Sequence, residues 1–100
     1  MTAEKKDRQS TRRALKAIFV LAGHTLQGLR LKAIAEALET SMPNALRDLE
    51  TLREEGIAER IPGREDSWRL TPQIVSVARA TDEEFARHRL ALVDLENRYS

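Results

Sequence analysis

The stretch SMPNALRDLETLREEGIAERIPGREDSWRL, residues 41–70, begins with the hydrophobic period of a helix and ends with that of a strand. Ser41 is a favourable N-cap, and Pro43 falls in the first turn, where its missing N–H costs nothing. Gly56 suits the end of the helix, because glycine readily adopts the left-handed conformation of a C-cap. The sequence therefore predicts a helix over residues 41–55, whose buried face consists of Ala45, Leu46, Leu49 and Leu52.

After this helix the apolar residues alternate, as they do in half-buried strands. The segments IAERI (57–61) and SWRL (67–70) flank PGRED, whose Pro-Gly pair favours a turn. We predict a β-hairpin with an exposed, charged tip. Trp68 is expected to belong to the core, where it would pin the hairpin to the helices.

Another helix is predicted directly before the opening stretch. Residues 31–38 carry apolar side chains at helical spacing, and a turn at 39–41 separates them from the next helix. Apolar and polar side chains alternate over residues 29–31, a pattern that favours a small strand.

The first helix is expected to begin at Ser10 or Thr11 and to end at about Ala22, with Gly23 as its stop. Residues 1–9 show no periodicity and are predicted to form a flexible basic arm. The apolar face expected for the helix consists of Ala14, Leu15, Ile18, Phe19 and Ala22.

Two helices are predicted after the hairpin. Thr71 and Pro72 open a short one that ends near residue 80, and Thr81 can cap a separate last helix. The last helix has a seam of side chains spaced 3, 4, 3 and 4, which is typical of helix packing. This seam is predicted to form a dimer contact, and the alternative is that it folds back on its own domain; its residues are Phe85, His88, Leu92, Leu95 and Tyr99.

Three helices followed by a β-hairpin make a winged helix-turn-helix, a mainly α fold with a small hairpin. We expect the winged domain over residues 10–80 and a packing or dimerisation helix over 81–100. With 100 residues, of which 41% are apolar, the chain is expected to form one domain.

The composition also limits the function. The absence of cysteine excludes disulfides and thiolate metal sites. The sequence has no Gly-rich phosphate loop and no histidine cluster with metal spacing, so we expect no enzymatic activity, metal or cofactor. The polar start lacks a secretory signal, and no apolar run approaches the roughly 20 residues that cross a bilayer. A cytoplasmic, nucleoid-associated protein without membrane contact is expected.

The charge is unevenly distributed. Residues 1–35 carry eight Lys/Arg against two acidic residues, a net charge of +6. Residues 36–100 carry nine Lys/Arg against fourteen acidic residues, a net charge of −5. This asymmetry suggests a basic end that faces a polyanion, although a solvated, charge-balanced surface is the alternative.

Residues 14–72 resemble the N-terminal DNA-binding domain of IclR-type transcriptional regulators, which implies a bacterial or phage regulator. The matching features are Ile34-Ala35, LETLREEG at the end of the third helix, and WRLTP after the wing. Regulators of that family usually carry a large C-terminal effector domain. This chain has no room for one, so we expect a stand-alone regulator without a small-molecule effector. The usual glycine of the helix-turn-helix turn is replaced by Glu39-Thr40-Ser41.

In this fold the third helix would enter the major groove of double-stranded DNA. Arg47 could contact guanine, Asn44 adenine, and Thr51 a thymine methyl or a phosphate. Asp48 would either accept a hydrogen bond from a cytosine amino group or hold a neighbouring side chain in place. The alternative is that these side chains are solvated residues of the helix surface that contact no DNA. The predicted base contacts are Met42, Asn44, Arg47, Asp48 and Thr51.

Phosphate contacts are expected from helix N-termini and from the wing. The basic arm, with Lys5, Lys6 and Arg8, could also follow the DNA backbone. The rival hypothesis is a winged helix that binds a protein through its acidic C-terminal half. The predicted phosphate contacts are Arg12, Arg13, Lys32, Ser41, Arg60, Arg64 and Arg69, and the expected assembly is a homodimer on a two-fold operator.

Overall fold

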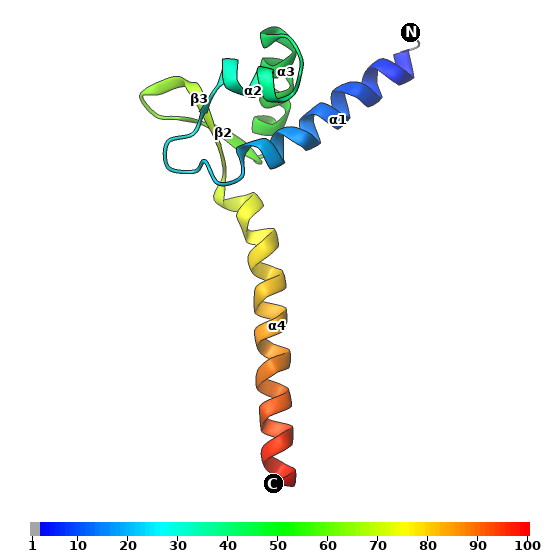
Figure 1. The fold of residues 1–100 in the computed structure, drawn as a ribbon, viewed down its shortest axis with the longest axis vertical. Helices are drawn as coiled ribbons and strands as arrows, with labels where there is room; N and C mark the ends of the chain where they lie inside the picture. Colours follow the sequence, from blue (N-terminus) through cyan, green and yellow to red (C-terminus); the bar gives the residue numbers. More distant parts are fainter. Residues whose placement is uncertain (1–2) are drawn as a thin grey trace.

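Helices and strands follow the predicted order as far as the hairpin in the computed structural model, which describes the backbone of residues 3–100 and the side chains from Arg8 onward. The mainly α fold with a β-hairpin, a winged helix-turn-helix, is confirmed (Figure 1). The elements are α1 (Ala3–Leu21), β1 (Leu29–Arg30), α2 (Leu31–Ala37), α3 (Met42–Glu54), β2 (Ala58–Ile61), β3 (Arg64–Leu70) and α4 (Pro72–Tyr99).

Helix α3 begins and ends as its sequence predicts. The Ser41 hydroxyl accepts a hydrogen bond from the Asn44 backbone N–H at 3.2 Å, and Pro43 lies in the first turn. After the helix, Gly56 has a φ of 75°, the left-handed conformation that favours glycine.

The strands form one antiparallel sheet in the order β1-β3-β2. The small strand predicted before α2 is β1, and its Leu29 lies opposite Trp68. The turn of the hairpin is tighter than predicted, since Pro62 and Gly63 alone separate β2 from β3. A register irregularity between Arg60 and Ile61 accommodates the longer β3.

The core lies between the three N-terminal helices and the inner face of the sheet. Trp68 is 1% exposed, which confirms its predicted core position. The largest fully buried side chains are Trp68, Leu21, Ile34 and Leu49.

Helix α1 differs from the prediction at both its start and its buried face. Residues 3–9, predicted as an arm, are helical, because they are mostly strong helix formers without glycine or proline. Residues 1 and 2, and the side chains of Lys5 and Lys6, lie outside the described residues. The face against the core is centred on Ala17 and Leu21, with Ala14 and Ile18 half-buried, whereas Leu15 and Phe19 are exposed.

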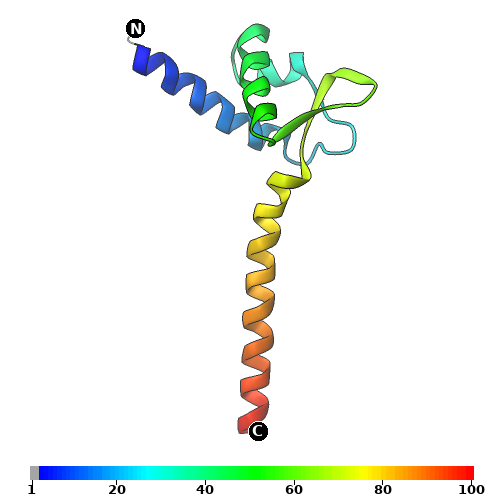
Figure 2. The same ribbon diagram turned by 180° about the vertical axis from the view of Figure 1, so that it is seen from behind.

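The two predicted C-terminal helices are one continuous helix, α4, which projects from the rest of the molecule (Figures 1 and 2). Thr81 lies inside it rather than at a cap, because no glycine or proline interrupts residues 73–99. None of the α4 side chains is buried. The seam therefore does not fold back on its own domain, and the molecule measures 63 × 38 × 21 Å.

Candidate nucleic-acid interface

The two halves of α3 carry opposite charge. Residues 41–47 contain no acidic side chain, and Arg47 is exposed among them. The second half carries the partly or fully exposed Glu50, Glu54 and Glu55. Because recognition helices present their N-terminal residues to base edges, the acid-free half is the part that suits an anionic groove.

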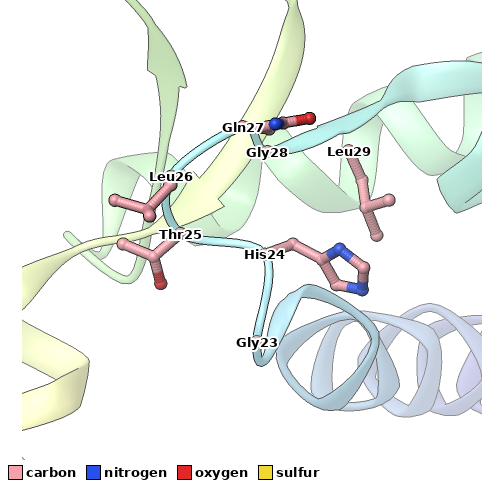
Figure 3. Close-up of a pocket in the computed structure, with 7 residues that line it drawn as sticks. All are labelled: Gly23, His24, Thr25, Leu26, Gln27, Gly28 and Leu29. Carbon is pink, nitrogen blue, oxygen red and sulfur yellow. The ribbon is translucent and has the colours of Figure 1, made fainter.

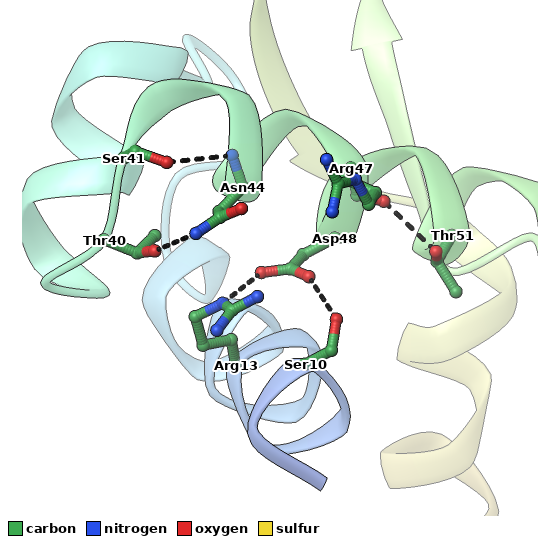
Figure 4. A network of polar contacts seen from close by, with 8 residues as sticks. All are labelled: Ser10, Arg13, Thr40, Ser41, Asn44, Arg47, Asp48 and Thr51. Atoms are coloured by element: carbon green, nitrogen blue, oxygen red, sulfur yellow. Dashed lines mark hydrogen bonds and ion pairs between the residues drawn. The ribbon is translucent and has the colours of Figure 1, made fainter. Parts of the chain in front are cut away.

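Four of the five predicted base-contact residues lie at or near the surface of α3, namely Met42, Asn44, Arg47 and Thr51. The Asn44 amide donates to the Thr40 hydroxyl at 3.1 Å, and the Thr51 hydroxyl donates to the Arg47 carbonyl at 3.1 Å (Figure 4). These local bonds hold the two polar side chains along one edge of the helix, while the guanidinium of Arg47 extends outward.

Asp48 does not belong to this exposed set. Its side chain is 2% exposed, and its carboxylate accepts from Arg13 Nε at 2.8 Å and from the Ser10 hydroxyl at 3.2 Å (Figure 4). The prediction that Asp48 reads a base is therefore wrong, because α1 crosses and covers that edge of α3. The alternative, that Asp48 holds a neighbouring side chain in place, is what the structure has.

Apart from Arg13, which donates to Asp48, the predicted phosphate contacts divide into two groups. Arg12 and Lys32 are exposed, and neither forms an ion pair within residues 8–100. Ser41 is exposed as the N-cap of α3. Arg64 is exposed at the wing tip, where it donates to the Gln27 carbonyl at 3.5 Å.

Arg60 and Arg69, the other two predicted phosphate contacts, are partly engaged within the protein. Arg60 pairs with Glu50 at 2.7 Å and lies over the Trp68 ring. Arg69 donates from Nε and Nη2 to Glu59 at 3.2 and 3.0 Å. Each arginine lies beside a strand partner, since Glu59 is opposite Arg69 and Arg60 is opposite Trp68 in the hairpin. The predicted strands already implied this register, so the pairs could have been found from the sequence.

The sequence suggests Glu50 only as one of the acidic groups that favour a protein partner, whereas in the structure it joins α3 to the wing. The hydrogen bond from Arg53, together with the charges of Arg60 and Arg53, holds the pKa of Glu50 below its usual value despite an opposing effect of partial burial. The carboxylate therefore stays ionised and fixes both arginines.

Arg30 was also missed by the sequence prediction. It pairs loosely with Asp66 at 3.7 Å, and both side chains remain largely exposed. The two residues line a cleft of ≈ 480 Å³ together with Arg64, Gln27 and their neighbours. Arg30 thus adds a cation beside the wing.

A second surface pocket, of ≈ 570 Å³, is lined by the loop over residues 23–29 (Figure 3). The side chains of His24 and Leu26 point to opposite sides of this loop. Among the described residues no group of three His, Cys, Asp or Glu could hold a metal ion. No helix in the described part of the chain is long and apolar enough to span a membrane.

The seam of α4 is unpartnered in the single chain. Phe85 is 57% exposed and Tyr99 85% exposed, and Leu92 and Leu95 also face solvent. His88 lies on the same stripe and is exposed. A row of large apolar side chains on a projecting helix is a surface that usually finds a partner.

Solved structures with this fold are similar to the chain. A Staphylococcus aureus MepR mutant bound to an oligodeoxyribonucleotide matches with a TM-score of 0.57 at 21% identity, over 91% of this chain and 72% of that one. A second S. aureus MepR mutant matches with a TM-score of 0.55 at 18% identity, over 91% and 75%. A Lactococcus lactis ZitR mutant in apo form matches with a TM-score of 0.50 at 19% identity, over 97% and 74%.

These likenesses show the winged-helix fold. MepR and ZitR are winged-helix regulators of the MarR type, so the comparisons do not support the IclR-type assignment. No protein-family model matches the sequence, and a comparison with curated proteins finds no relative.

Proposed function

We propose that the chain is a sequence-specific, double-stranded DNA-binding transcriptional regulator that places α3 in a major groove. The observation that carries this proposal is the exposed Arg47 on the acid-free half of a capped helix in a winged helix-turn-helix fold. A guanidinium in that place can donate two hydrogen bonds to guanine. The likeness to a MepR mutant bound to an oligodeoxyribonucleotide supports the proposal.

The surrounding cations fit the same role. Lys32 is exposed on α2, which precedes α3, and Arg64 is exposed at the tip of the wing, which follows α3. Arg12 is exposed on α1. Contacts from such side chains to phosphates would set the register of α3 on the duplex without reading sequence.

The regulator acts as a homodimer in this proposal, through the seam on α4. One winged helix reads about half a site, and two copies related by a two-fold axis read a two-fold symmetric operator. The exposed apolar side chains of the seam supply the contact, and we propose no catalytic activity, cofactor or small-molecule effector. A cytoplasmic, nucleoid-associated location follows from this role.

One observation favours a different function. The exposed Glu54 and Glu55 make the C-terminal end of α3 acidic, which suits a basic protein partner better than it suits DNA. In this second candidate the winged helix is a protein-interaction module that does not bind DNA.

Selection of bound duplexes from a random DNA pool at about physiological salt, followed by sequencing, tests the proposal. A two-fold repeated motif is expected, and Arg47→Ala should blur one position in each half, at a cost of about 1–3 kcal/mol in discrimination. Arg53→Ala is the matched control on the same helix, because Arg53 pairs with Glu50 on the acidic half. If the protein retains no DNA even at low salt, the DNA-binding function is wrong and the protein-interaction module is favoured.

A further inference from the structure

A buried carboxylate lies in the same row as side chains predicted to read DNA. Asp48 follows Asn44 by four residues and precedes Thr51 by three, so the three side chains share one edge of α3. Both carboxylate oxygens of Asp48 point toward α1, where one accepts from Arg13 and the other from Ser10 (Figure 4). The carboxylate cannot itself reach DNA, but the group it holds can.

Part of the Arg13 guanidinium forms no hydrogen bond with the rest of residues 8–100. A guanidinium has five N–H donors in a planar fork, and Asp48 takes the one on Nε. Within residues 8–100, neither Nη atom of Arg13 has a hydrogen-bond partner, and the side chain remains 22% exposed. Figure 4 shows the guanidinium beside Asp48 on the side of α3 that also carries Asn44. The free edge of the fork therefore lies along the row of predicted readers.

We propose that Asp48 is a positioning residue that aims the free edge of Arg13 at a phosphate bordering the groove occupied by α3. This inference rests on the proposed DNA-binding function. A major groove about 12 Å wide is nearly filled by a helix of about 10–12 Å, so the flanks of that helix lie next to the sugar–phosphate backbone. Arg13 lies on such a flank, and its hydrogen bond to Asp48 fixes it there before DNA arrives.

The residue type at position 13 matters for this role. Arginine can donate Nε–H to Asp48 and present its Nη groups to a phosphate at the same time. Lysine carries its three N–H donors on one nitrogen at the end of a flexible stem, so a bond to the buried carboxylate draws the whole ammonium toward Asp48 and away from the groove. The geometry thus distinguishes a phosphate clamp from a simple ion pair between α1 and α3, since an ion pair alone needs only charge.

The test is the salt dependence of DNA binding. The probe is a fluorescently labelled duplex of about 30 base pairs and random sequence, titrated at salt concentrations from about 50 to about 200 mM. Arg13→Gln is expected to reduce the slope of log K against log salt by about 0.9 per protomer, which is about an eightfold loss of affinity at about 0.1 M salt. Arg13→Lys and Asp48→Asn are expected to show most of the same reduction in slope and affinity, although both variants keep the positive charge of residue 13.

Arg87→Gln is the matched control, because it removes the same charge from an exposed position of α4 and should leave the slope unchanged. Unfolding of each variant by urea separates a loss of folded protein from a loss of contact. An unchanged slope in Arg13→Gln, or tighter binding by Asp48→Asn, would overturn the inference while leaving the proposed function intact. If the unsubstituted protein shows no salt-dependent binding, the proposed function fails, and the inference fails with it.

Discussion

Arg60 lies over Trp68, with its Cζ atom 4.6 Å from the centroid of the indole ring. The same guanidinium donates from Nη2 to Glu50 on α3 at 2.7 Å. Because Trp68 is fully buried in β3, this stack connects the core, the wing and α3 through one side chain. The orientation of the wing relative to α3 therefore depends on Arg60.

Arg60→Ala is expected to lower the free energy of unfolding by about 1–2 kcal/mol, since it removes both the cation–π contact and the bond to Glu50. Arg53→Ala removes the other partner of Glu50 without touching the wing, and should cost about 0.5 kcal/mol or less. Urea unfolding followed by Trp68 fluorescence measures both. Equal losses in the two variants would contradict a special role for the stack.

The stability of the protein should depend on the ionisation of Glu50. Its pKa is lowered in the folded state, chiefly by the Arg53 hydrogen bond, so its contribution is present above the ordinary carboxyl pKa and is lost as the pH falls through the folded value. The difference in unfolding free energy between the unsubstituted protein and Glu50→Gln should therefore shrink between about pH 6 and about pH 3. A difference that is constant over this range would contradict the assignment.

Local signals in the sequence were sufficient to predict α3 and the hairpin. The Ser41 cap, Pro43 and Gly56 are decided by contacts within a few residues, as is the change of period after the helix. The same local reasoning failed for α4, because Thr81 and the acidic residues after it resemble a cap although nothing breaks the helix there.

The errors at the candidate interface have a different cause. Asp48 has the same helical spacing as the side chains predicted to read bases, and only the path of α1 across that edge buries it. That path is a tertiary contact between residues 35 positions apart in sequence, so spacing along α3 could not reveal it. The pairing of Glu59 with Arg69 was accessible, in contrast, because the predicted hairpin register places them opposite each other.

Gly28 should tolerate substitution less well than Gly63, although both have a positive φ. A Cβ at Gly28 would lie 2.8 Å from the Trp68 carbonyl oxygen and 2.5 Å from Ile61 Cδ1, whereas a Cβ at Gly63 meets nothing within 4 Å. Gly63→Ala is expected to cost about 1–2 kcal/mol from backbone strain alone. Gly28→Ala adds a clash with backbone and should lower the unfolding free energy by at least about 1 kcal/mol more. Comparable losses in thermal unfolding would show that the sheet moves to accept the methyl group.

Glu39 has a φ of 54°, a left-handed conformation in the turn between α2 and α3. Glycine at this place relieves a strain of about 1–2 kcal/mol and loses about 0.5–1 kcal/mol through the entropy of the unfolded chain. Glu39→Gly should therefore raise the free energy of unfolding by about 0.5–1 kcal/mol. Glu39→Ala, which removes the carboxylate and keeps the strain, is the control in the same urea titration and should gain nothing. A gain in both variants would assign the effect to charge.

Two leucines on α4 differ in their position relative to the seam. Leu92 lies on the seam, and Leu90, two residues away, points to the opposite side, while both are exposed in the single chain. If the seam joins two copies, Leu92→Glu buries a carboxylate in the contact and should convert a dimer to a monomer, as measured by sedimentation equilibrium.

Leu90→Glu should leave the dimer intact because its side chain faces solvent in either state. The winged domain of both variants should remain folded, since no α4 side chain is buried in it. An equal response of the two variants would contradict the seam as the interface, and a monomeric unsubstituted protein would contradict dimerisation itself. A monomeric but folded Leu92→Glu should also bind a two-fold operator more weakly than the dimer, because its two half-sites would then be bound independently.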